Sequence, residues 1–357
     1  MGTSPSLANP IPVCFAVDVE PDPRQVDLRN REPWRGFELF QAWFDRLRDE
    51  LLRDGLGTVP TAWLLRLDPQ IRIAYGDGAW GARTYAAQFE NFLERGDEIG
   101  AHVHLYRPCD DGNGWIVDND DPAWAKVCVR ESLASYREAF GTDCQSISIG
   151  DRTLDQRLLA IYEDERVRYD FTVEPGLHGI ERMFPWEASR GVIPNFEGMP
   201  RDPWRPARDN FAREDRANGY PTILCPLATF RFPAAFELGR RVHQLGRRWQ
   251  GRLVSEDHRR QRWVRLCMTY RPWFFEFGLS RVSRKTALKV LHFVVRSDLP
   301  FEPDLQRNLA RNIRRIAADP RFRFVSPEEA VQLACPDLYE TPRQTRHDPL
   351  HGIGVLA

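Results

Sequence analysis

Apolar residues recur along the chain in two alternating patterns. Short apolar runs rich in β-branched and aromatic residues are followed by longer segments in which apolar positions lie three and four residues apart. The runs predict buried strands at residues 13–20, 58–67, 98–105, 145–149, 169–173, 222–227 and 291–295, and the longer segments predict helices at 37–52, 84–94, 123–140, 154–163 and 305–317. Because strands and helices alternate, we expect an α/β fold with a parallel sheet, and this number of strands favours a barrel over an open sheet.

Several segments depart from this alternation. Residues 184–220 are rich in Pro, Trp, Arg and Asn and predict a long functional loop. Residues 240–265 are strongly basic with helical spacing, and because acidic residues elsewhere balance this charge, a solvated helix face is expected rather than a phosphate or polyanion site. The residues after 342 are expected to be poorly ordered. An aromatic cluster predicts core packing, and it comprises Trp273, Phe274, Phe275 and Phe277.

Composition narrows the class of protein. The chain has 357 residues, 42% of them hydrophobic, so it can form a substantial core. Its formal net charge of −1 gives no global field for nucleic acid or an acidic membrane surface. The 7 cysteines are scattered and include no CxxC, which predicts buried free thiols. Because no signal peptide and no apolar run of about 18 residues is found, we expect a cytoplasmic enzyme without a membrane span.

Two pairs of polar residues stand at predicted strand ends. Asp18 and Glu20 are two residues apart, so their side chains point to the same face, where one carboxylate can bind a divalent cation while the other accepts a proton from water. His102 and His104 share this spacing on another strand. The histidine pair is the stronger signal, since the two acids alone would be weak evidence, and paired histidines together with a carboxylate predict a metal site with open positions.

The sequence around these residues resembles a known family. The blocks FAVDVEPD and GDEIGAHVHLYRP resemble the first two motifs of the polysaccharide deacetylases, carbohydrate esterase family four, in a branch with D-x-E and H-x-H motifs. Later blocks that begin SISIGDRTL, PTILCPLATF and LHFVVRSDL resemble its remaining motifs more loosely. The resemblance implies a distorted seven-stranded (β/α) barrel over residues 12–335 with insertions near 184–220 and 240–265, an N-terminal extension over 1–11 and a C-terminal tail over 336–357.

The resemblance also implies roles for individual residues. Asp18 matches the catalytic base, Glu20 the metal carboxylate and His102 the first metal histidine. The commoner family pattern places the second histidine where this chain has Tyr106, so His104 is expected to serve instead. The implied cofactor is one divalent metal ion, and zinc is the expected one for such nitrogen and oxygen ligands.

Other positions depart from the family pattern. Ser148 stands where an arginine normally orients the base, and Arg152 is a candidate substitute. Arg296 stands where the family has a histidine that acts as general acid, and because arginine stays protonated it suits an anion or oxyanion better than proton donation. His292, four residues earlier on the same strand face, is expected roughly 13 Å deeper in the barrel. The general acid is therefore either Asp18 or an unassigned group.

A further set of residues predicts the substrate-binding surface. Arg66 and Asp68 end the second strand on one face, and Trp204 in the long loop offers an aromatic platform for a sugar ring. The alternative is that these residues only hold the loop in place. The full set of candidate substrate-binding residues is Arg66, Asp68, Tyr106, Asp151, Trp204 and Arg205.

These features together predict a metal-dependent hydrolase that removes an N-acyl group, in the first instance N-acetyl, from an amino sugar or sugar conjugate. The expected partner is this carbohydrate substrate, and nucleic acid is not expected. Two alternatives stay open. The first is a catalytically silent barrel that binds a carbohydrate or a partner protein, and the second is an amidohydrolase acting on a non-sugar C–N bond.

Overall fold

The computed structural model describes residues 9–26, 32–109, 114–183, 187–233, 262–285 and 288–339. Its main sheet contains the strands β1 (Ile11–Val19), β2 (Thr61–Arg66), β3 (Glu98–Val103), β6 (Ser146–Ile149), β7 (Tyr169–Asp170), β9 (Ile223–Leu224), β12 (Leu291–Arg296) and β13 (Phe322–Phe324). The strands pair in the order β12-β1-β2-β3-β6-β7-β9, with β13 on β1, and all of these pairs are parallel. The seven strands of this order form a curled α/β half-barrel of the kind that the sequence predicts, and β13 adds an eighth strand beside β1.

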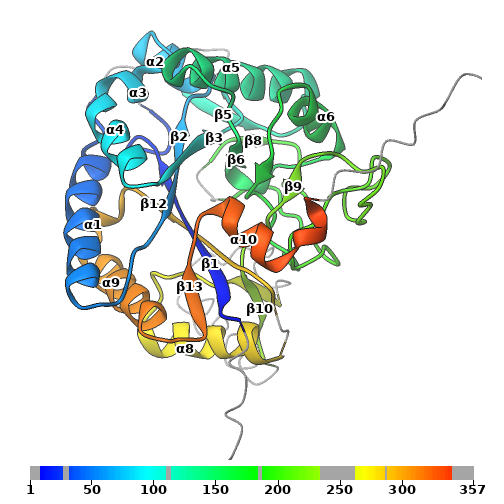
Figure 1. The fold of residues 1–357 in the computed structure, drawn as a ribbon. Helices are drawn as coiled ribbons and strands as arrows, with labels where there is room; N and C mark the ends of the chain where they lie inside the picture. Colours follow the sequence, from blue (N-terminus) through cyan, green and yellow to red (C-terminus); the bar gives the residue numbers. More distant parts are fainter. Residues whose placement is uncertain are drawn as a thin grey trace, which may run out of the picture.

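Helices surround this curled sheet. In Figure 1, α1, α4, α3, α2, α5 and α6 follow one another along its edge, α8 and α9 lie at the bottom, and α10 lies in front. The helices are α1 (Arg35–Arg53), α2 (Pro69–Tyr75), α3 (Trp80–Thr84), α4 (Ala86–Glu94), α5 (Pro122–Phe140), α6 (Gln156–Asp164), α8 (Pro272–Ser280), α9 (Pro303–Ala317) and α10 (Pro327–Ala334). Short 3-10 helices are η1 (Gly150–Arg152), η4 (Leu299–Phe301) and η5 (Pro336–Leu338), and η3 (Arg281–Lys285) is a π-helix. None of the described helices is long and apolar enough to cross a bilayer.

Two small sheets accompany the barrel. One joins β4 (Tyr106–Pro108), β5 (Trp115–Asp118) and β8 (Ser189–Arg190), and the other joins β10 (Thr229–Arg231) and β11 (Trp263–Arg265). The pattern of apolar positions did not predict these short strands. The expectation of a helix over residues 240–265 is wrong for Trp263–Arg265, which pair antiparallel with β10, and the part at 240–261 lies outside the described residues.

The barrel is distorted because its later strands are short. The ladder between β6 and β7 ends with the pair of Ile147 and Asp170. Beyond this pair the N–H of Ile149 donates to the hydroxyl of Thr172 at 2.8 Å. Within the described residues no ladder joins β9 to β12. There the N–H of Ala228 donates to the carbonyl oxygen of His292 at 3.0 Å.

Side chains of each strand alternate between the helices and the barrel interior. On β1, Phe15 and Val17 pack in the large core beneath the helices, while Ala16 belongs to an interior cluster that also contains Val294 and Val331. Val331 comes from α10, which closes one end of the interior with Cys335 and Leu338. The next interior positions after Ala16 are Asp18 on β1 and Glu20 just beyond its end. The alternation of side chains therefore places both carboxylates at the other end of the barrel.

Close packing of the interior depends on small residues. A Cβ on Gly100 of β3 would stand 2.5 Å from the carbonyl oxygen of Ser146 and 2.8 Å from the side chain of Leu64. Glycine is therefore required where β2, β3 and β6 approach one another. At this level of the sheet, the strands pack too tightly to admit a larger residue.

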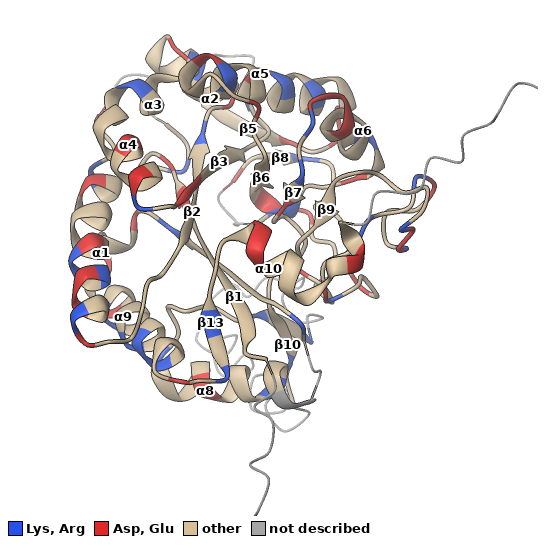
Figure 2. Cartoon of the chain, viewed as in Figure 1, with Lys and Arg blue, Asp and Glu red and all other residues tan. Residues whose placement is uncertain are grey.

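Charged residues of both signs lie on the outer helices (Figure 2). Arg314 of α9 pairs with Glu50 and Asp54 at the end of α1, and Arg137 of α5 pairs with Glu165 at 2.7 Å. Such exposed pairs contribute little to stability individually. The mixed charge agrees with the absence of a global electrostatic field.

Two predictions about burial need correction. Trp273, expected in the core, is 61% exposed on the outer face of α8, whereas Phe275 of the same cluster is buried. The cysteines are free as expected, but Cys109 and Cys267 are only partly buried. The predicted disorder after residue 342 lies outside the described residues.

Candidate active site

The two predicted pairs of polar residues meet at one cavity. Asp18 and Glu20 at the end of β1, and His102 and His104 at the end of β3, line a cavity of about 190 Å³. We call these four residues the histidine cluster. Strand β2 lies between β1 and β3, and the register places Arg66 beside His102. The structure therefore brings together the residues that the sequence predicts as base and metal ligands.

Three members of the histidine cluster can hold a metal ion. One ligand atom each of Glu20, His102 and His104 lies within 4.8 Å of the other two, and all three residues are buried. The Nε2 atoms of the two histidines are 3.0 Å apart, and Glu20 Oε2 is 3.6 Å from His104 Nε2. Ligands at about 2.1 Å from one ion stand roughly 3.0–3.4 Å apart, so these donors fit a divalent cation.

Each histidine presents its other ring nitrogen to a carboxylate. His102 Nδ1 lies 3.4 Å from Asp18 Oδ1, and His104 Nδ1 lies 3.4 Å from Asp151 Oδ2. A carboxylate on this side favours a proton on Nδ1 and leaves the lone pair of Nε2 for a cation. Both Nε2 lone pairs then face the same point, which is the arrangement a metal ligand pair requires.

Burial and neighbouring charges set the protonation of this cluster. Burial lowers the pKa of His102 to about 3, and burial together with Arg66 lowers that of His104, so both rings are neutral. Burial alone would raise the pKa of Glu20, but Arg296 and the histidines hold it well below its usual range. The cluster therefore presents one carboxylate and two neutral imidazoles, the forms that bind metal.

Asp18 differs from Glu20 although it lies only two residues away. Burial, and then the charge of Glu20, raise the pKa of Asp18 to about 8. A carboxyl group with a pKa near neutrality can both accept and return a proton. The pKa values of the two acids are thus shifted in opposite directions, upward for Asp18 and downward for Glu20, as expected for a base and a metal ligand.

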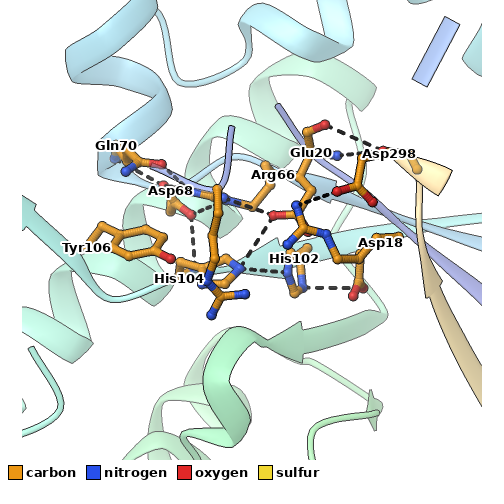
Figure 3. Close-up of polar contacts among 12 residues, drawn as sticks. Asp18, Glu20, Arg66, Asp68, Gln70, His102, His104, Tyr106 and Asp298 are labelled. Carbon is orange, nitrogen blue, oxygen red and sulfur yellow. Dashed lines mark hydrogen bonds and ion pairs between the residues drawn. The ribbon is translucent and has the colours of Figure 1, made fainter. Parts of the chain in front are cut away.

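A buried network supports the histidine cluster from behind (Figure 3). The Arg66 guanidinium donates to Glu20 Oε2 at 3.3 Å, to Asp68 Oδ2 at 2.6 Å and to Gln70 Oε1 at 2.8 Å. Asp68 in turn accepts the backbone N–H of His104 at 2.9 Å. Arg66 and Asp68 were predicted to contact substrate, but both are fully buried and neither lines the cavity. Their contacts instead orient Glu20 and His104.

Tyr106 also lies beside the cluster rather than in the cavity. Its ring stacks on His104 with centroids 5.0 Å apart and an interplanar angle of 12°. Its hydroxyl donates to Glu187 Oε1 at 3.0 Å. Tyr106, a predicted substrate contact, therefore packs against His104 and does not line the cavity.

The segment after β6 places His104 against the backbone. A Cβ on Gly150 would stand 2.2 Å from the His104 ring, so only glycine fits there. Asp151 and Arg152 follow with φ of 57° and 59°, a left-handed conformation that non-glycine residues rarely adopt. This unusual backbone brings Asp151 to His104 and Arg24, and both Asp151 and Arg152 line the cavity. Strain of this kind is typical of functional sites.

Beyond β6 the cavity wall carries a second charged group, which we call the arginine cluster and which comprises Arg152, Glu174 and Arg265. All three line the cavity. Arg265 Nη1 donates to Glu174 Oε1 at 3.1 Å. Arg152 is 4% exposed, its Nη2 lies 3.5 Å from the carbonyl oxygen of His178, and its Nε and Nη1 have no hydrogen-bond partner among the described residues.

The positions that depart from the family pattern have distinct surroundings. Arg296 lines the cavity as expected, and its guanidinium contacts Glu20 Oε1 at 3.0 Å and Asp298 Oδ2 at 3.2 Å. Ser148 also lines the cavity. His292 does not, and its Nδ1 faces the carbonyl oxygen of Pro226 at 3.1 Å. Of these two residues of β12, Arg296 lines the cavity and His292 does not.

Trp204 and Arg205 lie away from the cavity. Trp204 is 1% exposed, exchanges backbone hydrogen bonds with Leu224 and donates from its indole to the carbonyl oxygen of Phe211 at 2.9 Å. Arg205 donates to the carbonyl oxygen of Leu338 at 2.6 Å. Neither lines the cavity, so the alternative that they hold the loop in place describes their position.

Sequence reasoning missed several residues of the site. Glu174 ends a predicted strand with an acid, as Asp18 does, and this signal could have been used. Arg265 lay inside the segment interpreted as a solvated helix. Arg24 follows β1 in an irregular loop and contacts Asp151 and, at 3.1 Å, Glu187, which no local pattern indicates.

Comparison with known proteins gives a likeness in fold. No family model matches the sequence, and no curated protein matches it. Among solved structures, a Mycobacterium smegmatis protein assigned to the polysaccharide deacetylases is 12% identical with a TM-score of 0.46, and the match covers 91% of this chain and 93% of that one. A Pseudomonas aeruginosa protein with the same assignment is 13% identical with a TM-score of 0.47 and coverages of 93% and 92%. Puue allantoinase is 10% identical with a TM-score of 0.47 and coverages of 90% and 89%. At these values no conclusion about function follows from the matches.

Proposed function

We propose that the protein is a metal-dependent hydrolase that removes an N-acyl group, N-acetyl in the first instance, from an amino sugar or sugar conjugate. One observation carries the proposal. Glu20, His102 and His104 converge on one point at the cavity, with Asp18 beside His102. The sequence resemblance to the polysaccharide deacetylases supports the choice of an N-acyl sugar.

The ligand set suits a borderline divalent ion such as zinc. Glu20, His102 and His104 would hold it, and Asp18 and Asp151 would orient the imidazoles from behind. A divalent ion bound there would supply Lewis-acid activation of a water molecule and of the acyl carbonyl.

Asp18 performs the proton transfers in this proposal. Its carboxylate takes a proton from the attacking water as the water oxygen bonds to the acyl carbon. When the C–N bond breaks, the same proton passes from Asp18 to the departing nitrogen, which leaves as a free amine, and the acyl group leaves as a carboxylic acid. A pKa of about 8 allows both transfers near neutral pH. This dual role provides a general acid where the chain lacks the family's late histidine.

A second candidate is an amidohydrolase that acts on a non-sugar C–N bond. The cavity lining favours it in one respect. Among the described residues that line the cavity, Phe171 is the only Phe, Tyr or Trp, and Trp204 does not reach the cavity. A stacking platform for a sugar ring is therefore small. The same four residues of the histidine cluster would carry either reaction.

Metal binding tests the proposal first. We expect the purified protein to bind one equivalent of zinc, and His102→Ala to abolish tight binding. His178→Gln is the matched control, because His178 is a partly exposed histidine that pairs with Glu197 outside the cavity. If the wild-type protein and His178→Gln bind no divalent ion in a direct titration, the hydrolase proposal is wrong.

Activity tests it second. Release of acetate from a panel of N-acetyl sugars, with cyclic amides in parallel, separates the two candidates. Asp18→Asn should keep the metal and lower kcat by about 10²–10⁴-fold, the usual contribution of a general base. Unchanged turnover in Asp18→Asn would remove Asp18 from the mechanism.

A further inference from the structure

Arg152 is a buried cation that the protein itself leaves incompletely paired. Its side chain lines the cavity, 4% of the residue is exposed, and Nε and Nη1 have no hydrogen-bond partner among the described residues. The contact of Nη2 with the His178 carbonyl oxygen is long, at 3.5 Å. A guanidinium with two unsatisfied donors in a buried position is costly unless something pairs with it.

The charge of Glu174 acts on Arg152, but among the described residues no carboxylate of the cavity forms a hydrogen bond or ion pair with it. The lining contains the carboxylates of Asp18, Glu20, Asp151 and Glu174 and the guanidinium groups of Arg24, Arg152, Arg265 and Arg296. Each carboxylate already faces another group: Asp18 faces His102, Glu20 contacts Arg66 and Arg296, Asp151 contacts Arg24 and His104, and Glu174 accepts from Arg265.

The balance of charge points to an anion in this cavity. The four carboxylates and four guanidinium groups leave no net charge when all are ionised. A divalent ion in the histidine cluster would make the cavity positive. Within the arginine cluster alone, two guanidinium groups face the single carboxylate of Glu174, which already accepts a hydrogen bond from Arg265. An additional anion beside Arg152 would therefore compensate charge at the place where hydrogen-bond donors are free.

We propose that Arg152, together with Arg265, binds an oxyanion group of the substrate, either a carboxylate or a phosphate. This inference rests on the proposed function and names the substrate class, namely an N-acylated amino sugar or related amide that carries an acidic group. Planar guanidinium groups bind both kinds of oxyanion through paired N–H donors, which lysine cannot reproduce. The acidic group would hold the substrate by the arginine cluster while the amide lies at the histidine cluster.

The role assigned here differs from the one expected from the sequence, in which Arg152 orients the base. Among the described residues Asp18 faces His102, and no contact joins Arg152 to Asp18. Arg152 is therefore placed to bind a ligand rather than to position the base.

Binding to the metal-free protein tests the proposal independently of catalysis. In the presence of a chelator, titration calorimetry would measure inorganic phosphate, glucuronate and neutral N-acetylglucosamine against the wild type, Arg152→Met, Arg152→Lys and Arg130→Met. Arg130 is the control for loss of one positive charge, since it pairs with Asp164 on the surface. A melting curve of each variant confirms folding.

We expect at least one of the two oxyanions to bind the wild type and Arg130→Met with the same affinity. Arg152→Met should weaken this binding by about tenfold or more, with Arg152→Lys between the two. Preference for glucuronate identifies a carboxylate and preference for phosphate identifies a phosphate ester. Equal binding by wild type and Arg152→Met, or no oxyanion binding by the wild type, overturns the inference. Because the metal is absent, these outcomes are separate from failure of the hydrolase proposal, which the zinc titration reports.

Discussion

The two charged groups of the cavity differ in what faces their polar atoms. Among the described residues Asp18 Oδ1 and the Nδ1 atoms of His102 and His104 lack a hydrogen bond, but each histidine Nδ1 lies 3.4 Å from a carboxylate oxygen. In the histidine cluster, Glu20 contacts two arginines and each histidine ring lies between another ring and a carboxylate. In the arginine cluster, Arg152 keeps two donors without a partner among the described residues. The histidine cluster rests on a buried network, whereas Arg152 rests on a strained turn and one long hydrogen bond.

This difference separates two ways of building a binding site. A metal site gains from ligands held rigidly in advance, because hydrogen bonds and ion pairs to the ligand side chains fix their orientation before the ion binds. A substrate contact must leave donors free in the absence of ligand, and the protein is less stable for it. The histidine cluster has the first property and the arginine cluster has the second.

The largest expected effect follows from removing the support of the histidine cluster. Arg66→Met leaves Asp68 and part of Glu20 buried without a counter-charge, and breaking such a buried pair costs about 3–5 kcal/mol of the free energy of unfolding. Urea denaturation would measure this loss. Zinc affinity should also fall, by about 10–100-fold, since Arg66 and Asp68 orient the ligands.

The exposed pair of Arg72 with Glu131 provides the control. Arg72→Met removes an arginine from the same region of the chain at a surface position, and exposed pairs contribute about 1 kcal/mol at most. Similar losses of stability in Arg66→Met and Arg72→Met would contradict the view that the Arg66 network is a rigid support.

The scaffold below the arginine cluster should respond to pH. Asp170 is fully buried and accepts from Thr172, which lines the cavity, and from Tyr162. Burial raises its pKa from 3.8 to about 6. Between these two pH values the unfolded carboxyl is ionised while the folded one is protonated, so the folded state binds more protons and its stability falls as pH rises.

This contribution should amount to about 3 kcal/mol between pH 4 and pH 6 and be constant above pH 6. Asp170→Asn keeps an acceptor for Thr172 and cannot ionise, so the difference in unfolding free energy between wild type and variant should change with pH over this window alone. A difference that does not vary with pH would show that Asp170 does not titrate in the folded protein.

The seven main strands and the histidine cluster could be predicted because they depend on local patterns. Alternation along a strand determines which side chains share a face, so Asp18 and Glu20 on β1, and His102 on β3, face the cavity as the two-residue spacing indicates. The (β/α) order then requires that these carboxyl ends meet.

The rest of the site depends on contacts between distant parts of the chain. Arg265 reaches the cavity because its strand, β11, pairs with β10 and places Arg265 opposite Thr229. Trp204 is buried because it pairs with Leu224. Neither pairing has a sequence signal comparable to strand alternation, and a basic segment or a tryptophan in a loop is therefore easily assigned to solvent or to substrate.

A smaller effect is expected at the turn between the two clusters. In Gly150→Ala the new methyl group would stand 2.2 Å from the His104 ring, so the ring or the turn must shift. Overpacking of this kind costs about 1–3 kcal/mol. We expect weaker zinc binding together with this loss, measured by competition with a chromophoric chelator. Gly141→Ala is the control for strain, because Gly141 ends α5 with φ of 71° and a methyl group there meets nothing within 4 Å. Normal zinc affinity in Gly150→Ala would show that His104 is not held in place by the turn.

The smallest effect is expected for Arg152→Met, and it should have the opposite sign. Methionine has no donors to leave unsatisfied, so in ligand-free buffer the variant should be more stable than the wild type by about 1 kcal/mol. An oxyanion that binds only the folded wild type should reverse this order, since a ligand at a hundred times its Kd adds about 2.7 kcal/mol. Urea denaturation with and without the oxyanion identified by calorimetry would show the reversal. A variant that is less stable than the wild type in both buffers would mean that Arg152 supports the fold, and the contrast between the two clusters would fail. The sign of this small change therefore decides whether the protein retains an unpaired buried arginine for its ligand or for its own structure.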